Sequence, residues 1–167
     1  MKRKFRAAYV TRSARIGALY VALTYLSTVL GLSSGVIQFR FSEALCILPI
    51  FMAEAVPGLF IGCLISNIMA SGVPMDLILG SLATLLGAVC ARAMRALPDK
   101  LLPLATLPNI ISNTLIVPLV LIFAYGAPQG YGYIAATVFI GEAVCGGLGG
   151  YALLSVIKKS GIDRLLG

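Results

Sequence analysis

Apolar residues occur in six long stretches along this chain, separated by short polar segments. The stretches cover residues 14–32, 44–53, 57–70, 76–91, 101–125 and 133–157. A helix that crosses a bilayer needs about 20 predominantly apolar residues. The pattern predicts an all-α membrane protein, a six-transmembrane-helix bundle that forms a single domain over residues 1–167. The second and third stretches are short, however, and a fusion of the two into one span has to be tested.

The positions of the basic residues distinguish six spans from five. With six spans and a cytoplasmic N terminus, 12 of the 13 Lys and Arg residues lie on the cytoplasmic side, and Arg40 alone lies outside. Fusing the second and third stretches moves later loops to the other side and places 6 inside and 7 outside. The positive-inside rule therefore selects six spans with both termini in the cytoplasm. We expect the two short helices, with Pro57 in the first turn of the third, not to cross the whole hydrocarbon layer.

Composition supports a membrane protein and excludes several other classes. Mean hydropathy is +0.99 and only 11% of residues are charged, whereas about a quarter are charged in soluble domains. We expect no cleavable secretory signal, and we assign the net charge of +7 to cytoplasmic loops rather than to nucleic-acid binding. The chain has no His, no CxxC pair and no Walker phosphate loop. We therefore expect no enzyme activity, no catalytic residues, no metal and no cofactor.

Glu142 is the most informative polar residue. It lies near the middle of the last apolar stretch, which contains no basic residue before position 158. A carboxylate at the bilayer centre costs roughly 2.5–3.5 kcal/mol on insertion scales, so such residues usually face a cavity and mark a binding or conduction path. The alternative is a protonated acid that is hydrogen-bonded to a neighbouring helix.

Other polar residues gather, in the predicted topology, between the membrane midplane and the outer face. This distribution is typical of an outward-facing pocket with apolar walls and a few directional polar groups. The residues are Glu43, Ser66, Asn67, Asp76, Ser81, Asn109 and Asn113.

Structural interpretations remain open for several of these residues. Glu43 can be a helix-start carboxylate that the helix dipole favours. Asn109 and Asn113 are four residues apart and share a helix face; two amides there suit a heterocycle, but they can equally hydrogen-bond between helices. Asp76 can cap the fourth helix after Pro74.

Residues 33–42 form a predicted extracellular loop with alternating apolar and polar positions from 36 to 42. That period is typical of extended backbone. One interpretation is a gate over the pocket, in which Gln38 or Arg40 contacts the ligand. The other is a plain connector, in which Arg40 pairs with Glu43 or with lipid headgroups.

Ala14, Ala18 and Ala22 recur at every fourth position of the first stretch, beside Gly17. Small residues at this spacing allow another helix to approach closely. The stripe is either a surface for a partner or a site of ordinary packing inside the monomer.

Three sequence motifs resemble the QueT family. They are residues 38–45 (QFRFSEAL) followed by Leu48-Pro49, residues 56–63 (VPGLFIGC) with Asn67, and Asp76 followed by residues 80–85 (GSLATL). The resemblance extends from about residue 14 to residue 158.

The resemblance implies a function and a set of partners. QueT proteins are regarded as queuosine precursor transporters and as substrate-binding S components of energy-coupling factor (ECF) transporters in the bacterial cytoplasmic membrane. Such a subunit binds a 7-deazaguanine base and works with a transmembrane coupling subunit and two cytoplasmic ATPase subunits. The stripe Ala14, Ala18 and Ala22 is similar to the alanine motif that docks on the coupling subunit.

The predicted substrate contacts rest on depth in the membrane rather than on the resemblance. They are Glu142, Glu43, Asn109, Asn113, Asn67, Arg40 and Gln38. Two alternatives to an S component stay open. One is a proton-coupled secondary transporter with Glu142 and Asp76 as proton carriers, and the other is a membrane scaffold that transports nothing.

Overall fold

The computed structural model describes residues 2–33, 38–70 and 72–163, with the backbone alone at 2–6. It is 84% helical and the described residues contain no strand, which confirms the all-α prediction. Its elements are α1 (Lys2–Val29), η1 (Phe41–Ile50), α2 (Ala55–Ala70), α3 (Pro74–Ala93), η2 (Met94–Ala96), η3 (Asp99–Thr106), α4 (Leu107–Phe123), α5 (Tyr131–Glu142), η4 (Ala143–Gly149) and α6 (Gly150–Ser160).

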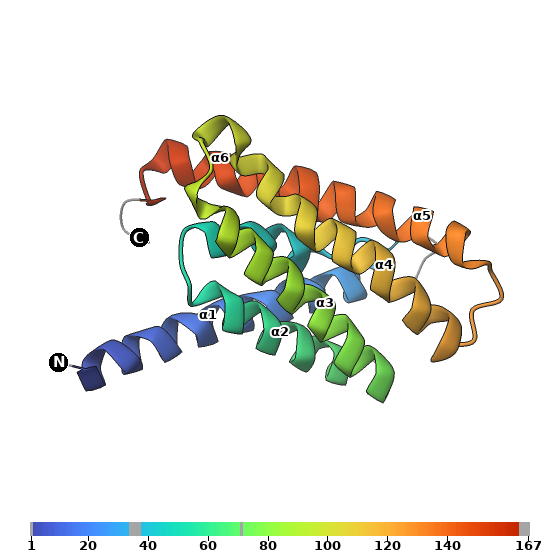
Figure 1. Cartoon of the computed structure of the whole chain (residues 1–167). Coiled ribbons are helices and arrows are strands. Elements are labelled where there is room, and N and C mark those ends of the chain that lie inside the picture. Colours follow the sequence, from blue (N-terminus) through green and yellow to red (C-terminus); the bar gives the residue numbers. More distant parts are fainter. Residues whose placement is uncertain (1, 34–37, 71, 164–167) are drawn as a thin grey trace.

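Each predicted apolar stretch corresponds to one helical rod (Figure 1). Among the described residues, the rods at 74–96, 99–123 and 131–160 are long and apolar enough to cross a membrane, with 23, 25 and 30 residues. Most boundaries lie within a few residues of the prediction. Helix α1 begins at Lys2, well before the first apolar stretch at residue 14. Its first half is rich in Lys, Arg and Ala, which are good helix formers and extend the helix beyond the apolar part.

The second rod, η1, is a 3₁₀ helix at the centre of the bundle. Eight of its ten residues are buried, including Glu43, Cys46 and Pro49. A 3₁₀ helix rises about 2 Å per residue, so ten residues span only about 20 Å, less than the roughly 30 Å hydrocarbon layer. Its three-residue period also places Glu43 and Cys46 on one face.

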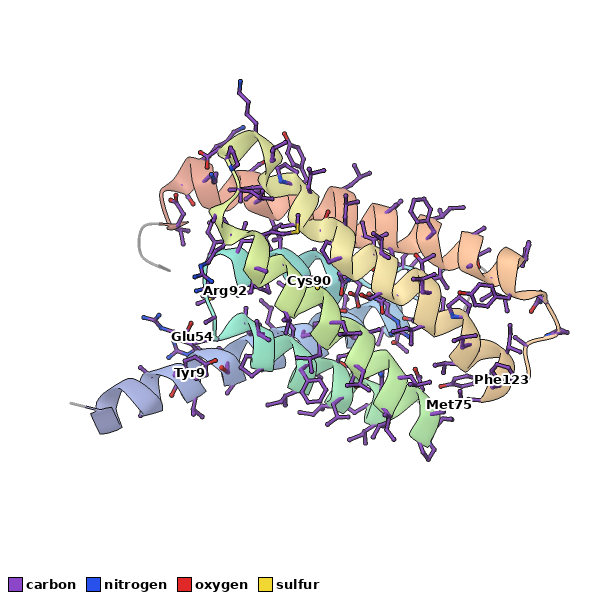
Figure 2. All side chains as sticks on the ribbon, in the orientation of Figure 1. Tyr9, Glu54, Met75, Cys90, Arg92 and Phe123 are labelled. Carbon is purple, nitrogen blue, oxygen red and sulfur yellow. The ribbon has the colours of Figure 1, made fainter. Side chains whose placement is uncertain are left out.

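Arg92 of α3 stabilises the end of η1. Its guanidinium donates hydrogen bonds to the carbonyls of Pro49 (3.1 Å) and Ile50 (3.4 Å). The last carbonyls of a helix have no partner within the helix, and a cation near them also interacts favourably with the helix dipole. Arg92 therefore ties the central rod to the end of α3 (Figure 2).

Helices α1 and α2 cross through three glycines. A Cβ at Gly58 would lie 2.7 Å from the Ser13 carbonyl, and one at Gly62 would lie 2.9 Å from the Gly17 carbonyl and 2.8 Å from the Tyr20 Cβ. The two backbones are therefore as close as side chains permit, as in other membrane helix pairs joined through small residues.

The two ends of the bundle differ in chemistry. The first turns of α1 project beyond the bundle at one end (Figure 1), where Arg12 pairs with Glu54 at 3.4 Å and Lys158 pairs with Asp99. Tyr9 and Glu54 lie at this end in Figure 2, and Met75 and Phe123 lie at the opposite end. The opposite end is formed by the start of α3 and the end of α4.

The glycine crossing predicts a stability effect. Gly62→Ala places a methyl group against backbone and against Tyr20, so we expect a loss of about 1–3 kcal/mol, or roughly 2–4 °C in Tm per kcal/mol for a chain of this size. Thermal unfolding of the purified protein in detergent measures it. Gly130→Ala is the control, because a Cβ there meets nothing within 4 Å. Equal melting temperatures for the two variants would contradict the crossing.

Candidate functional site

Glu43 is the centre of a buried polar network. Its side chain is 2% exposed. The Tyr20 hydroxyl donates to one carboxylate oxygen at 2.6 Å, while the Asn109 amide (2.8 Å) and the Cys46 thiol (3.4 Å) donate to the other. The three donors come from α1, η1 and α4, so this network joins these elements at one point.

Glu142 belongs to the same network. The Asn109 nitrogen that bonds Glu43 also donates to a Glu142 carboxylate oxygen, at 3.3 Å. Two carboxylates beside one donor repel each other when both are ionised, so such a pair favours a shared proton or a nearby cation. Glu142 is 9% exposed and faces the protein interior rather than lipid.

Two adjoining cavities lie beside this acid pair. The smaller, about 20 Å³, is lined by Glu142, Asn113 and Val138. The larger, about 430 Å³, extends toward the end of the bundle formed by α3 and α4, past Val120, Asn67 and Asp76. Gln38, Arg40 and Val117 line both. The larger volume falls within the range of small-molecule sites.

Two buried amide atoms near the acid pair have no hydrogen-bond partner among the described residues. They are the Asn113 nitrogen and the Asn109 oxygen. Both side chains are at least 96% buried, with exposures of 4% and 1%. Asn113 and Glu142 line the same small cavity, yet the Asn113 nitrogen makes no hydrogen bond within the distance and angle limits of one. A buried unsatisfied amide costs roughly 1–3 kcal/mol. Asn113 lines the inner cavity, so its nitrogen marks a place where a ligand or water supplies the missing partner. The Asn109 oxygen lies instead against Gly87 of α3.

Asn67, Asp76 and Tyr125 line the larger cavity. The Tyr125 hydroxyl donates to an Asp76 carboxylate oxygen at 2.8 Å, and the Asn67 amide donates to the Asp76 backbone carbonyl at 3.2 Å. The capping position of α3 is Val73, and Asp76 lies in the first turn. Asp76 therefore contributes a carboxylate to the cavity wall.

Residues 38–40 form extended backbone that packs directly on α5. A Cβ at Gly141 would lie 2.0 Å from the Gln38 carbonyl oxygen. The Phe39 amide donates a hydrogen bond to the Leu32 carbonyl at 2.9 Å, and the Phe41 amide donates one to the Ser27 hydroxyl at 3.0 Å. Residues 34–37 of the predicted gate lie outside the described residues. The described part holds Gln38 and Arg40 against both cavities.

All seven predicted contact residues lie around the acid pair or its cavities. Glu142, Asn113, Asn67, Arg40 and Gln38 line the cavities. Glu43 and Asn109 lie behind Glu142 and hold it. Arg40 forms no ion pair with Glu43 within 4.0 Å in the described part of the chain, where two ion pairs occur elsewhere.

The alanine stripe lies on a different surface. Ala14, Ala18 and Ala22 are exposed, while Gly17 beside them is buried in the α1–α2 crossing. Ala14, Ala18, Pro57 and Ile61 line an apolar groove of about 390 Å³ between α1 and α2. The stripe therefore does not pack inside the monomer.

Sequence reasoning missed three kinds of residue. Tyr20 resembled ordinary core in an apolar helix, although its hydroxyl holds Glu43. Tyr125 follows α4 and carries no local signal of its bond to Asp76. Gly87 is required because a Cβ there would lie 2.6 Å from the Asn109 Cα. An isolated Gly inside an apolar helix was the available signal for such a close approach.

The close contact between residues 38–40 and α5 predicts how a substitution at Gly141 changes proteolysis. Gly141→Ala must push the Gln38 backbone off α5 and expose this segment, so we expect trypsin to cut after Arg40 several-fold faster. Mass spectrometry of timed digests identifies the fragment that ends at Arg40. Gly132→Ala on the same helix is the matched control, because a Cβ there meets nothing within 4 Å. Unchanged cleavage in Gly141→Ala would show that the segment is not held in this way.

Comparison with known proteins identifies the family to which the chain belongs. The family model described as QueT transporter matches residues 10–159. A relative from Lactococcus lactis subsp. cremoris (strain MG1363), described as queuosine precursor transporter QueT, is 37% identical over 83 residues. That alignment covers 50% of this chain and 48% of the relative. No solved structure gives a significant match. With its apolar helices and a family match over most of its length, this multi-pass membrane protein belongs to the QueT transporter family.

Proposed function

We propose that the chain is the substrate-capture S component of an ATP-driven ECF-type importer for a queuosine precursor, a 7-deazaguanine. The observation that carries the proposal is the acid pair Glu43 and Glu142 beside a cavity with an unpaired Asn113 amide. The family match and the printed name of the Lactococcus relative support the substrate class.

The site has the hydrogen-bonding groups that a guanine-type edge requires. Such an edge presents adjacent N–H donors and a carbonyl acceptor. The Glu142 carboxylate accepts the donors, and the Asn113 nitrogen donates to the carbonyl. Glu43 and Asn109 hold Glu142 in place from behind. A site built to hydrogen-bond a polar edge discriminates strongly against molecules that lack it.

In the proposed topology six segments cross or enter the bilayer, with both chain ends in the cytoplasm, and the larger cavity opens outward. Gln38 and Arg40, which line both cavities, then contact the ligand. The exposed stripe Ala14, Ala18 and Ala22 docks on the transmembrane coupling subunit, because small side chains let a partner helix approach closely. Two cytoplasmic ATPase subunits supply the energy, since the chain has no Walker phosphate loop.

Direct binding tests the substrate claim. We expect a radiolabelled 7-deazaguanine to bind the purified protein, and Glu142→Gln to weaken binding by about 10- to 100-fold, because a hydrogen bond to a charged group contributes roughly 1.5–3 kcal/mol. Glu54→Gln is the control, since Glu54 pairs with Arg12 at the far end of the bundle. Size-exclusion profiles check that both variants fold. Failure of the wild type to bind would remove the substrate claim.

The proposed docking surface predicts that a substitution in the alanine stripe reduces uptake without reducing ligand binding. Ala18→Leu fills the exposed groove without touching the cavities, so we expect normal ligand binding but a loss of most uptake in cells that contain the ATPase subunits. Leu19→Phe is the control, because Leu19 is exposed on α1 outside the groove.

The same uptake assay tests the proton-coupled alternative, which the acid pair around Asn109 favours. Uptake that continues without the ATPase subunits and stops with a protonophore would replace the importer by a proton-coupled transporter. Unimpaired uptake by Ala18→Leu would contradict the docking surface.

A further inference from the structure

A further cavity, of about 130 Å³, lies between the last turns of α1 and α2. Its lining residues are Val21, Thr24, Tyr25 and Thr28 of α1 and Ser66, Met69 and Ala70 of α2. Tyr25 and Met69 are 60% and 61% exposed, so the cavity is open at the surface of these two helices. In a membrane protein, that surface is covered by lipid.

Ser66 brings an unused hydrogen-bond donor to this cavity. Its side chain is only 5% exposed, and its hydroxyl has no hydrogen-bond partner among the described residues. The two threonine hydroxyls of the cavity already have acceptors. Thr24 donates to the Tyr20 carbonyl (2.9 Å) or the Ser42 hydroxyl (2.8 Å), and Thr28 donates to the Thr24 carbonyl at 3.1 Å. A hydroxyl has one proton to donate, so Ser66 is the buried hydroxyl here whose proton is still available.

These groups define the chemistry of an occupant. A buried donor without an acceptor is costly, so the occupant must present an acceptor to Ser66. Val21, Met69 and Ala70 add apolar surface around the hydroxyls, which suits a molecule that is mostly hydrocarbon. A water would need about two to four polar partners, whereas the ester group of a lipid needs one donor and an apolar wall for the chain beside it.

The position of the cavity agrees with such an occupant. Both helices end beside it, and the chain turns at Gly31 and Gly72, where φ is 72° and 63°. In the proposed topology these ends lie toward the outer face, near the boundary between the hydrocarbon core and the headgroups where lipid esters lie. The exposed Tyr25 is typical of this boundary, because tyrosines are enriched at membrane–water interfaces.

We propose that the cavity between α1 and α2 is a phospholipid site, in which the Ser66 hydroxyl donates a hydrogen bond to an ester carbonyl of the lipid. The acyl chain next to that ester lies against Val21 and Met69. The site is separate from the capture of substrate, and it holds whatever the transported solute is.

Two phospholipids that differ only in their chain linkage provide the test. One is a diester phosphatidylcholine, and the other is the diether lipid with the same headgroup and chain length, which has no carbonyl oxygen. The full chain is placed in nanodiscs that contain both in equal amounts, and native mass spectrometry counts the lipid that stays bound after the outer lipids are removed. We expect the diester lipid to be retained at least about threefold more often, as one net hydrogen bond provides. The comparison needs no variant.

Ser66→Ala assigns the preference to this cavity. We expect the variant to fold and to retain the two lipids equally, because no described residue loses a hydrogen bond. Ser155→Ala is the control, since the Ser155 hydroxyl donates to the Tyr151 carbonyl of its own helix at 2.9 Å and lies outside the cavity. A preference for the diester lipid that survives in Ser66→Ala would overturn the assignment.

The other outcomes also decide the matter. Equal retention of the two lipids by the wild type, or retention of neither, would overturn the lipid site and leave water as the partner of Ser66. The radiolabel assay of the proposed function is independent of these results, so the failure of one proposal is distinguishable from the failure of the other.

Discussion

A carboxylate in the middle of an apolar bundle must be hydrogen-bonded from every side, and Glu43 imposes this constraint on the fold. Its partners come from α1, η1 and α4, so these three elements cannot separate without leaving a buried charge unpaired. Removing one partner of such a group costs several kcal/mol. The same network extends through Asn109 to Glu142 on α5. The polar centre that holds the bundle together therefore also positions the cavity wall.

Glycines determine how closely the segments that carry this network approach one another. At Gly87 the backbone of α4 comes so close to α3 that a Cβ would overlap Asn109, and at Gly141 the Gln38 carbonyl occupies the space of a side chain. The first contact sets the position of Asn109, which donates a hydrogen bond to Glu142. The second holds Gln38 on α5, where Gln38, Arg40 and Glu142 line the same cavity. Because lipid provides little hydrophobic driving force between helices, such close packing is a main source of their association.

Much of this arrangement could be predicted from the sequence, because it depends on local properties. Apolar length predicts the helices, and an acid in an apolar stretch predicts a residue that avoids lipid, as Glu142 does. The 3₁₀ form of η1 could not be predicted, since it depends on burial by neighbouring elements. The bond between Tyr125 and Asp76 likewise joins residues far apart in sequence. Asp76 after Pro74 suggested a cap, and only the fold places Tyr125 beside it.

Helix α1 carries two different tasks on its two faces. Tyr20 points inward and holds Glu43, while Ala14, Ala18 and Ala22 are exposed, the first two of them in the apolar groove. Between these faces the helix is fixed to α2 by contacts at Gly58 and Gly62 that leave no room for a side chain. Tyr20 therefore belongs to a closely packed helix pair. One helix thus carries both a partner of the buried acids and the exposed alanine stripe.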